Sequence, residues 1–115
     1  MDIKNNSISY VEFKATDLEK IKTFYHKCFG WNFTDFGPTY VAFNESGLDG
    51  GFEKTEDAIV NGALIVLYHQ DLVAIKDTIV KAGGNIIKDI FSFPGGRRFH
   101  FTDPSGNELA VWSDK

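Results

Sequence analysis

The sequence has few of the features that mark exported, membrane or nucleic-acid-binding proteins. It holds a single cysteine, Cys28, so no disulfide can form within the chain, which suits a reducing compartment. Its longest apolar run, residues 63–68, is too short to cross a bilayer, and residues 1–7 contain no apolar segment of the kind found in a leader. The net charge of −4 lacks the basic footprint of a nucleic-acid binder. We therefore expect a cytoplasmic protein with no membrane or nucleic-acid partner.

Aromatic residues, in contrast, are plentiful. They make up 15% of the 115 residues, and 11 of them are phenylalanine. A chain of this length buries roughly two-thirds of its unfolded surface when it folds as one unit. We therefore expect a single domain spanning residues 1–115.

The sequence matches itself at an offset of 54 residues. The matched pairs are Asp17 with Asp71, Leu18 with Leu72, Ile21 with Ile75, Lys22 with Lys76, Lys27 with Lys81, Gly30 with Gly84 and Asp35 with Asp89. These pairs fall at a helix start, along its buried face, at its end and in the following strand, so the repeated object is a supersecondary unit. We expect two modules, about residues 8–55 and 62–113, with a cleft at the seam between them.

Each module reads as one strand, one helix and three further strands. Asp17 and Asp71 are predicted helix N-caps, and glycines after each apolar helical stripe predict the helix ends. The predicted strands are 10–14, 31–36, 39–43 and 50–54 in the first module, and 63–68, 85–90, 97–102 and 108–113 in the second. A proline and a glycine within residues 103–107 predict a hairpin between the last two strands. The expected fold class is α+β, built from two tandem βαβββ modules.

Several strings in this order are similar to one known superfamily. They are VEF at 11–13, DLEK at 17–20, FY at 24–25, FGW at 29–31 and FTDPSGN at 101–107. Together they resemble the glyoxalase, bleomycin-resistance and extradiol dioxygenase proteins, also called vicinal oxygen chelate proteins. The resemblance implies mixed sheets curled around a cleft that dimerisation commonly completes, so we expect a homodimer. Its members include metal-dependent lyases, isomerases and dioxygenases, and also metal-free proteins that only bind small molecules.

Strand alternation indicates which side chains face the expected cleft. Val11, Phe13, Leu109 and Val111 form the core side of the first and last strands, and their neighbours face the other way. Extended through the repeat, this gives a candidate ligand-binding set of Tyr10, Glu12, Tyr40, Glu53, Tyr68, Arg98, His100, Glu108 and Trp112. Aromatic rings with a few polar groups are typical of sites for organic ligands.

The resemblance also implies where a metal would bind. Metal-dependent members place His, Gln or Glu at four symmetry-related positions on the first and last strands of the modules. The matching positions here hold Tyr10, Gly51, Leu64 and Ala110, and the last three offer no donor atom. We therefore predict no cofactor. A shifted set of Glu12, Glu53, His100 and Glu108 is the alternative, acceptable to Mn, Fe or Ni, although strand positions two apart lie roughly 7 Å from each other.

These observations favour a metal-free protein that binds a small aromatic or conjugated molecule, with Arg98, Glu12 or His100 fixing its orientation. The alternative is an enzyme of the lactoylglutathione lyase, isomerase or dioxygenase type, using a shifted metal set or Glu12 as general base. A cleft position would desolvate Glu12 and raise its pKa, as a general base requires. His100 is the second catalytic candidate. A module that only contacts another protein is a third hypothesis.

Overall fold

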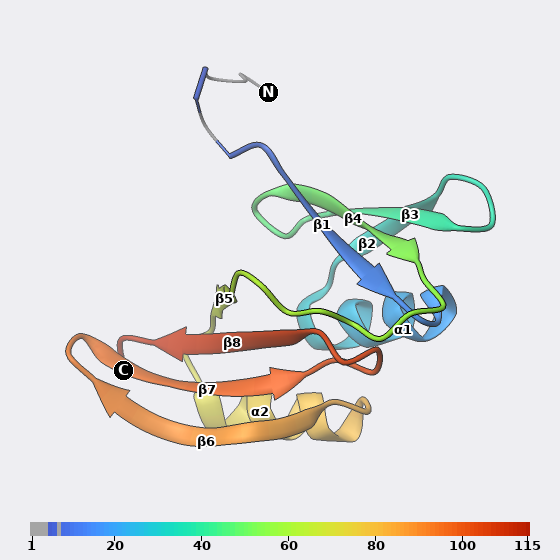
Figure 1. Cartoon of the computed structure of the whole chain (residues 1–115). Helices are drawn as coiled ribbons and strands as arrows, with labels where there is room; N and C mark the ends of the chain where they lie inside the picture. The colour runs from blue at the N-terminus through green and yellow to red at the C-terminus, as the bar shows by residue number, and fades with distance from the viewer. Residues whose placement is uncertain (1–4, 7) are drawn as a thin grey trace.

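The protein, described here from a computed structural model covering residues 5, 6 and 8–115, consists of two four-stranded sheets, each with one helix (Figure 1). The elements are β1 (Tyr10–Ala15), α1 (Leu18–Phe29), β2 (Asn32–Asp35), β3 (Tyr40–Asn44), β4 (Asp49–Lys54), β5 (Ile65–Tyr68), α2 (Leu72–Lys81), β6 (Asn85–Phe93), β7 (Gly96–Thr102) and β8 (Glu108–Ser113). The predicted α+β class with a repeated βαβββ order is confirmed. Neither of the described helices has the length and apolar character needed to span a membrane.

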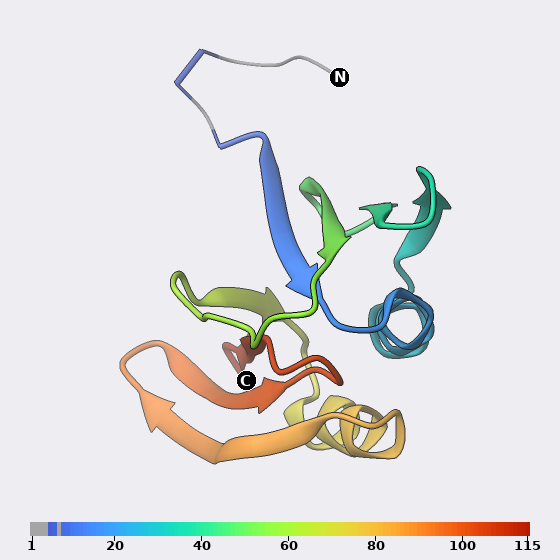
Figure 2. The ribbon, with the colours of Figure 1, turned by 45° about the vertical axis from the view of Figure 1, so that its right-hand side comes forward.

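The two sheets share one topology. Their strand orders are β1-β4-β3-β2 and β5-β8-β7-β6, so the second is the first with every number raised by four. In each sheet the first strand pairs in parallel with the last, and all other neighbours are antiparallel. Figure 2 shows the two sheets set at an angle to each other, with α1 and α2 on the same side of the molecule.

Three of the residue pairs matched at the 54-residue offset make the same contacts in both modules. Asp17 and Asp71 cap α1 and α2, each accepting a hydrogen bond from the backbone N–H three residues later, at 3.1 and 3.0 Å. Lys22 pairs with Asp35 at 3.0 Å, and Lys76 pairs with Asp89 at 2.6 Å. The sequence repeat is therefore a repeat of helix caps and of helix-to-strand ion pairs.

Two strands differ from their predicted bounds by more than one residue at an end. The strand predicted from residue 63 begins at Ile65, because the parallel ladder with β8 starts where Ile65 lies opposite Leu109. Before that point the Glu108 N–H donates to the Asn61 side chain at 2.9 Å instead. The strand predicted to end at residue 90 continues to Phe93, since two register shifts let β6 stay paired with β7 along its whole length.

An aromatic stack forms the core and joins the modules through α1. The Tyr25 ring stacks on Trp31 at 4.7 Å between centroids, and Trp31 stacks on Phe43 of β3 at 4.5 Å. From the same helix Phe24 lies 6.1 Å from Phe101 of β7. Cys28 is buried on this helix face, and its burial raises the pKa of the thiol to about 11. Helix α1 thus packs against both sheets.

Asp103, in the β7–β8 hairpin, is a buried carboxylate that holds several elements together. It accepts hydrogen bonds from the Tyr25 hydroxyl at 2.9 Å, from the Asn107 side chain at 2.9 Å, and from the backbone N–H groups of residues 105–107 at 2.9–3.0 Å. The Asn107 side chain also donates to the Lys14 carbonyl at 2.8 Å. The hairpin is thereby tied both to α1 and to β1 of the other module.

Replacing Asp103 with alanine is expected to lower the free energy of unfolding by about 2–4 kcal/mol, because several buried donors lose their acceptor together. Tyr25→Phe, which removes one of these bonds, is expected to cost about 1 kcal/mol. Urea unfolding followed by circular dichroism measures both. The control is Asp77→Ala, which breaks only the exposed pair with Lys81. If the Asp103 and Asp77 variants are equally stable, Asp103 does not hold the modules together.

Candidate functional site

Each sheet has an inner face, defined here as the face opposite its helix. In Figure 1, α2 lies behind β6, β7 and β8, so the viewer looks at the inner face of that sheet. Alternation places the predicted site residues on these two faces. Tyr10, Glu12, Tyr40 and Glu53 lie on the β1–β4 inner face, and Tyr68, Arg98, His100, Glu108 and Trp112 lie on the β5–β8 inner face.

Polar groups on the β1–β4 inner face are bonded to one another. The Tyr40 hydroxyl donates to Glu12 Oε1 at 3.0 Å and is itself hydrogen-bonded to the Tyr10 hydroxyl. Burial, with help from these two partners, raises the pKa of Tyr40 above its usual range. Glu53 pairs with Lys14. Glu12 is exposed, so the desolvation expected for it is not found.

The Tyr40 side chain also occupies the space above Gly51, one of the four positions at which metal-dependent relatives would carry a ligand. A Cβ atom built on Gly51 would lie 2.7 Å from Tyr40 Cζ and 2.7 Å from the Val41 carbonyl oxygen. Real side chains do not tolerate such distances, so no His or Glu fits there without displacing Tyr40. Across the described residues, no three His, Cys, Asp or Glu side chains are grouped so that they could hold a metal. The residues present do not fit the family metal.

Gly51→Ala is therefore expected to destabilise the protein by about 1–3 kcal/mol through overpacking. In a Tyr40→Ala background the same change should cost less, because one of the two obstructing groups is gone. Gly62→Ala is the matched control, since a Cβ at that position meets nothing within 4 Å. Thermal unfolding of the variants and of the double mutant measures the coupling. A Gly51→Ala variant as stable as Gly62→Ala would show that Tyr40 leaves room for a ligand at residue 51.

Residues on the β5–β8 inner face form one continuous cluster. Trp112 lies opposite Arg98 across the β7–β8 ladder and opposite Tyr68 across the β5–β8 ladder. The Tyr68 ring meets Trp112 edge to face, with centroids 5.2 Å apart. His100 Nδ1 lies 2.9 Å from Glu108 Oε2. All five predicted residues of this sheet are therefore neighbours.

Phe91 and Phe93 belong to this cluster, and the sequence analysis did not assign them to the site. The Arg98 guanidinium lies over both rings, with its Cζ 5.3 Å from the Phe91 centroid and 5.8 Å from that of Phe93. Phe93 also lies 6.4 Å from Trp112. One feature of the sequence could have identified Phe91 and Phe93 as site residues. A two-residue turn at 94–95 pairs Phe93 with Gly96, and counting back from it places Phe91 opposite Arg98.

Two nitrogen atoms of this cluster are buried without a hydrogen-bond partner. They are Arg98 Nε and His100 Nε2, and they are the only such side-chain atoms that the described residues contain. The His100 residue is only 8% exposed. Arg98 makes no ion pair with any acidic side chain in the described ranges. Buried polar atoms are normally satisfied, so these two mark a place where a further group is expected.

Among the described residues, the predicted side chains of the two inner faces form two separate groups. No hydrogen bond, ion pair or ring contact between described residues joins Tyr10, Glu12 or Tyr40 to the cluster around Arg98 and Trp112. A small cavity of about 170 Å³ does lie at the seam, between β1, residues 59–63 and the start of β8. Of the predicted residues it includes Glu12 and Glu108 only. That volume is below the range of about 300–1,000 Å³ found for organic-ligand pockets.

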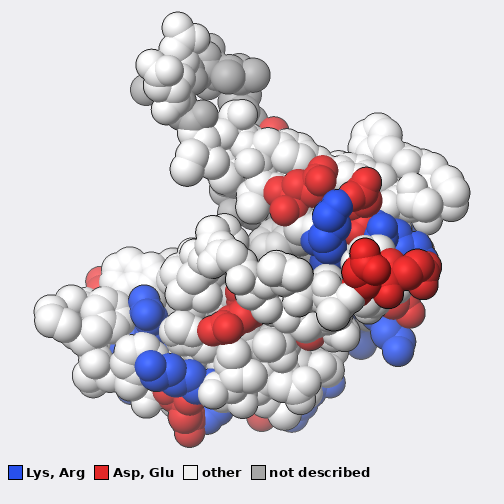
Figure 3. Space-filling view, in the orientation of Figure 1, with Lys and Arg blue, Asp and Glu red and all other residues white. Residues whose placement is uncertain are grey.

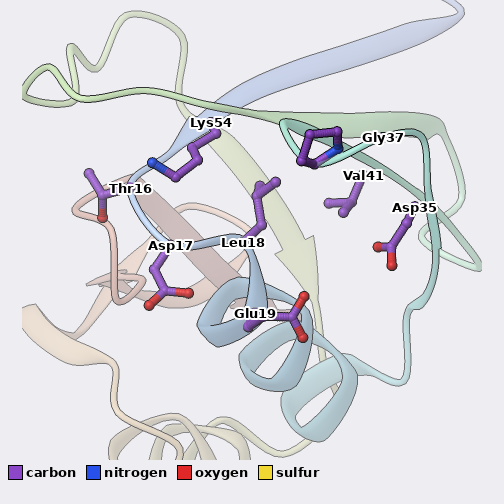
Figure 4. A pocket seen from close by; sticks show the side chains of 9 residues that line it. Thr16, Asp17, Leu18, Glu19, Asp35, Gly37, Val41 and Lys54 are labelled. Carbon is purple, nitrogen blue, oxygen red and sulfur yellow. The ribbon is translucent and has the colours of Figure 1, made fainter.

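A larger cavity of about 410 Å³ lies on the helix side of the β1–β4 sheet, at the start of α1 (Figure 4). Its charged side chains already have partners. Asp17 caps the helix, Asp35 pairs with Lys22, and Lys54 pairs with Glu56 at 2.6 Å. Figure 3 shows acidic and basic side chains crowded together in this part of the molecule, whereas charged groups are fewer and more widely spaced over β7 and β8. The cluster with unsatisfied nitrogens is therefore the stronger candidate site.

The fold and the hairpin motif can be compared with known proteins. The family model of the Glyoxalase/Bleomycin resistance protein/Dioxygenase superfamily matches residues 7–111. The chain belongs to this superfamily. It is 29% identical over 123 residues to a glyoxylase-like domain-containing protein of Didymella fabae, covering 95% of this chain and 94% of that protein.

Two solved structures illustrate the range of proteins with this fold. One is a glyoxalase/bleomycin resistance protein/dioxygenase family enzyme from Burkholderia phytofirmans PsJN, with a TM-score of 0.81 at 15% identity over 93% of this chain and 98% of that one. The other is TnmS3, an antibiotic binding protein from Streptomyces sp. CB03234, with a TM-score of 0.71 at 19% identity over 97% and 98%. At these identities the likeness establishes the fold alone.

Proposed function

We propose that this superfamily member binds a small planar organic molecule on the β5–β8 inner face and does so without a metal. The observation that carries the proposal is the pair of buried, unpartnered nitrogens, Arg98 Nε and His100 Nε2, within an aromatic cluster. Leaving each of them unsatisfied costs about 1–3 kcal/mol, a cost that a bound polar group would offset. Phe91, Phe93 and Trp112 supply ring surfaces against which a flat ligand can pack.

The donor atoms on both inner faces support a metal-free site. The four positions implied by the family hold Tyr, Gly, Leu and Ala, and Gly51 is covered by Tyr40. In the alternative set, Glu53 is paired with Lys14, and His100 with Glu108. TnmS3, which shares this fold, is named as an antibiotic binding protein.

A cytoplasmic homodimer is part of the same proposal. Strands β1 and β5 are each at a sheet edge in the described chain, with Tyr10, Val66 and Tyr68 exposed there. Unpaired edges and exposed aromatic side chains favour association with a second copy. A partner's β1–β4 inner face would complete the wall that a single chain leaves open.

A panel of planar aromatic compounds should raise the melting temperature of the protein, since a ligand that binds only the native state stabilises it. Trp112→Ala is expected to weaken binding by about tenfold or more, because it removes a ring from the centre of the cluster. Phe36→Ala is the matched control, as Phe36 is 62% exposed and lies at the β2 end of the other sheet. The proposal fails if no compound binds, or if the Phe36 and Trp112 variants lose affinity equally.

Freshly purified protein is expected to contain far less than one equivalent of any transition metal, because no described group of side chains provides three suitable ligands. Elemental analysis by mass spectrometry measures this, and melting curves with added Ni, Zn, Mn, Fe and Co complete the test. One equivalent of a single metal that chelator removes with loss of stability would contradict a metal-free site.

An enzyme of the lactoylglutathione lyase or isomerase type is the second candidate. The observation in its favour is the hydrogen-bonded chain of Tyr10, Tyr40 and Glu12, which holds a carboxylate in place on the β1–β4 inner face. Metal-dependent turnover of a hemithioacetal that Glu12→Gln abolishes would establish this activity in place of binding alone.

A further inference from the structure

The site on the β5–β8 inner face has a cation, Arg98, at one end and a hydrogen-bond acceptor, His100 Nε2, at the other. These two groups narrow the class of ligand that the site can bind. We propose that it takes an aromatic hydroxy acid, with the carboxylate held by Arg98 and a hydroxyl on the opposite end of the ring donating to His100 Nε2. This inference rests on the proposed function, because it names the ligand of the same site.

The Arg98 end selects an anion. The guanidinium is always charged, makes no ion pair within the described chain and leaves Nε without an acceptor. A second cation lies nearby, since Lys88 Nζ is 4.4 Å from the centroid of the Phe91 ring that Arg98 also contacts. The planar guanidinium lies over the Phe91 and Phe93 rings. A carboxylate can take two parallel hydrogen bonds from such a fixed fork.

The His100 end selects a hydrogen-bond donor. Its Nδ1 lies 2.9 Å from a Glu108 carboxylate oxygen, and that acceptor requires the ring proton to sit on Nδ1. In the neutral ring Nε2 then carries a lone pair and can only accept. The hydrogen bond from His100 also engages the Glu108 carboxylate. Glu108 therefore repels an incoming anion less than a carboxylate without a hydrogen-bond partner would.

The spacing of the two ends requires a ring between them. Arg98 and His100 are two positions apart on β7 and point to the same face, so their backbones are roughly 7 Å apart. A carboxylate on Arg98 cannot donate to His100 Nε2, whereas a ring with a hydroxyl at its opposite end supplies a donor at this backbone spacing. Phe91 lies against both, 5.9 Å from the His100 ring, and shields the two nitrogens. Because Phe91 lies on the edge strand next to a register shift, its ring can turn aside as the ligand enters.

Three matched compounds test the two ends separately: para-hydroxybenzoate, para-hydroxybenzamide and benzoate, titrated by NMR at pH 7.5. The acid is expected to bind about tenfold or more tightly than its amide, and more tightly than benzoate by about threefold to tenfold. Arg98→Gln should remove the preference for acid over amide and keep the hydroxyl effect. His100→Phe should do the reverse. Arg97→Gln, one residue along the strand, is the control for charge alone.

A measurement on the unchanged protein covers the case in which a variant fails to fold. Raising the salt concentration should weaken binding of the acid and leave binding of the amide almost unchanged. If acid and amide bind equally and show the same salt dependence, the inference is wrong while the proposed function stands. If benzoate binds as tightly as para-hydroxybenzoate, the role given to His100 is wrong. If no compound of this set or of the wider aromatic panel binds, the proposed function itself fails.

Discussion

The buried carboxylate of Asp103 is the constraint on which the candidate site depends. It fixes the β7–β8 hairpin through three backbone N–H groups and ties that hairpin to Tyr25 of α1. The hairpin in turn sets the register of β8 against β7. Because side chains alternate along a strand, a slip of one residue would move Trp112 and Glu108 into the core and expose Leu109 and Val111. A structural residue outside the candidate site thus decides which side chains the inner face presents.

The two modules share a scaffold but differ in what their inner faces offer. On the β1–β4 face, Tyr10, Tyr40 and Glu12 satisfy one another, and the Tyr40 ring covers Gly51. On the β5–β8 face, Arg98 and His100 keep nitrogens without partners. The two modules therefore differ in hydrogen bonding: these polar groups have partners on the β1–β4 inner face, and two nitrogen atoms lack partners on the β5–β8 inner face. Helix caps and ion pairs nevertheless recur at the same offset.

The burial of strand residues could be predicted from the sequence, because it follows the local alternation of side chains. Features that depend on how distant segments pair could not be predicted in this way. The alternation of β8 correctly placed Leu109 and Val111 in the core. Strand β6 was predicted too short, because its register shifts hide the continuing ladder, and Phe91 and Phe93 were missed with it. A bulge also puts Lys88 opposite His100, where counting from the turn would place Asp89.

Glu12 was predicted to lie in a cleft that desolvates it, and it is exposed instead. Alternation predicts on which face of a sheet a side chain lies, but it does not predict which residues lie opposite that face. The same limit explains why the nine predicted site residues separate into two groups. Each sheet was assigned correctly from its own pattern, while the angle between the sheets is set by α1 packing and by the Asp103 and Asn107 contacts. Those contacts join residues far apart in the sequence, and no periodicity encodes them.

The residues around Arg98 and His100 explain how the fold tolerates two buried nitrogen atoms without hydrogen-bond partners. Two buried polar atoms without partners oppose folding by about 1–3 kcal/mol each, comparable with one good core contact. The aromatic core beneath this face, including Phe99 and Phe101, provides the stability that permits such a cost. Phe93 also lies against the Arg98 guanidinium and restricts it, so little further order is lost when an acceptor arrives. Folding thus prepares the polar groups in advance, and a ligand that completes their hydrogen bonds gains from an arrangement already formed.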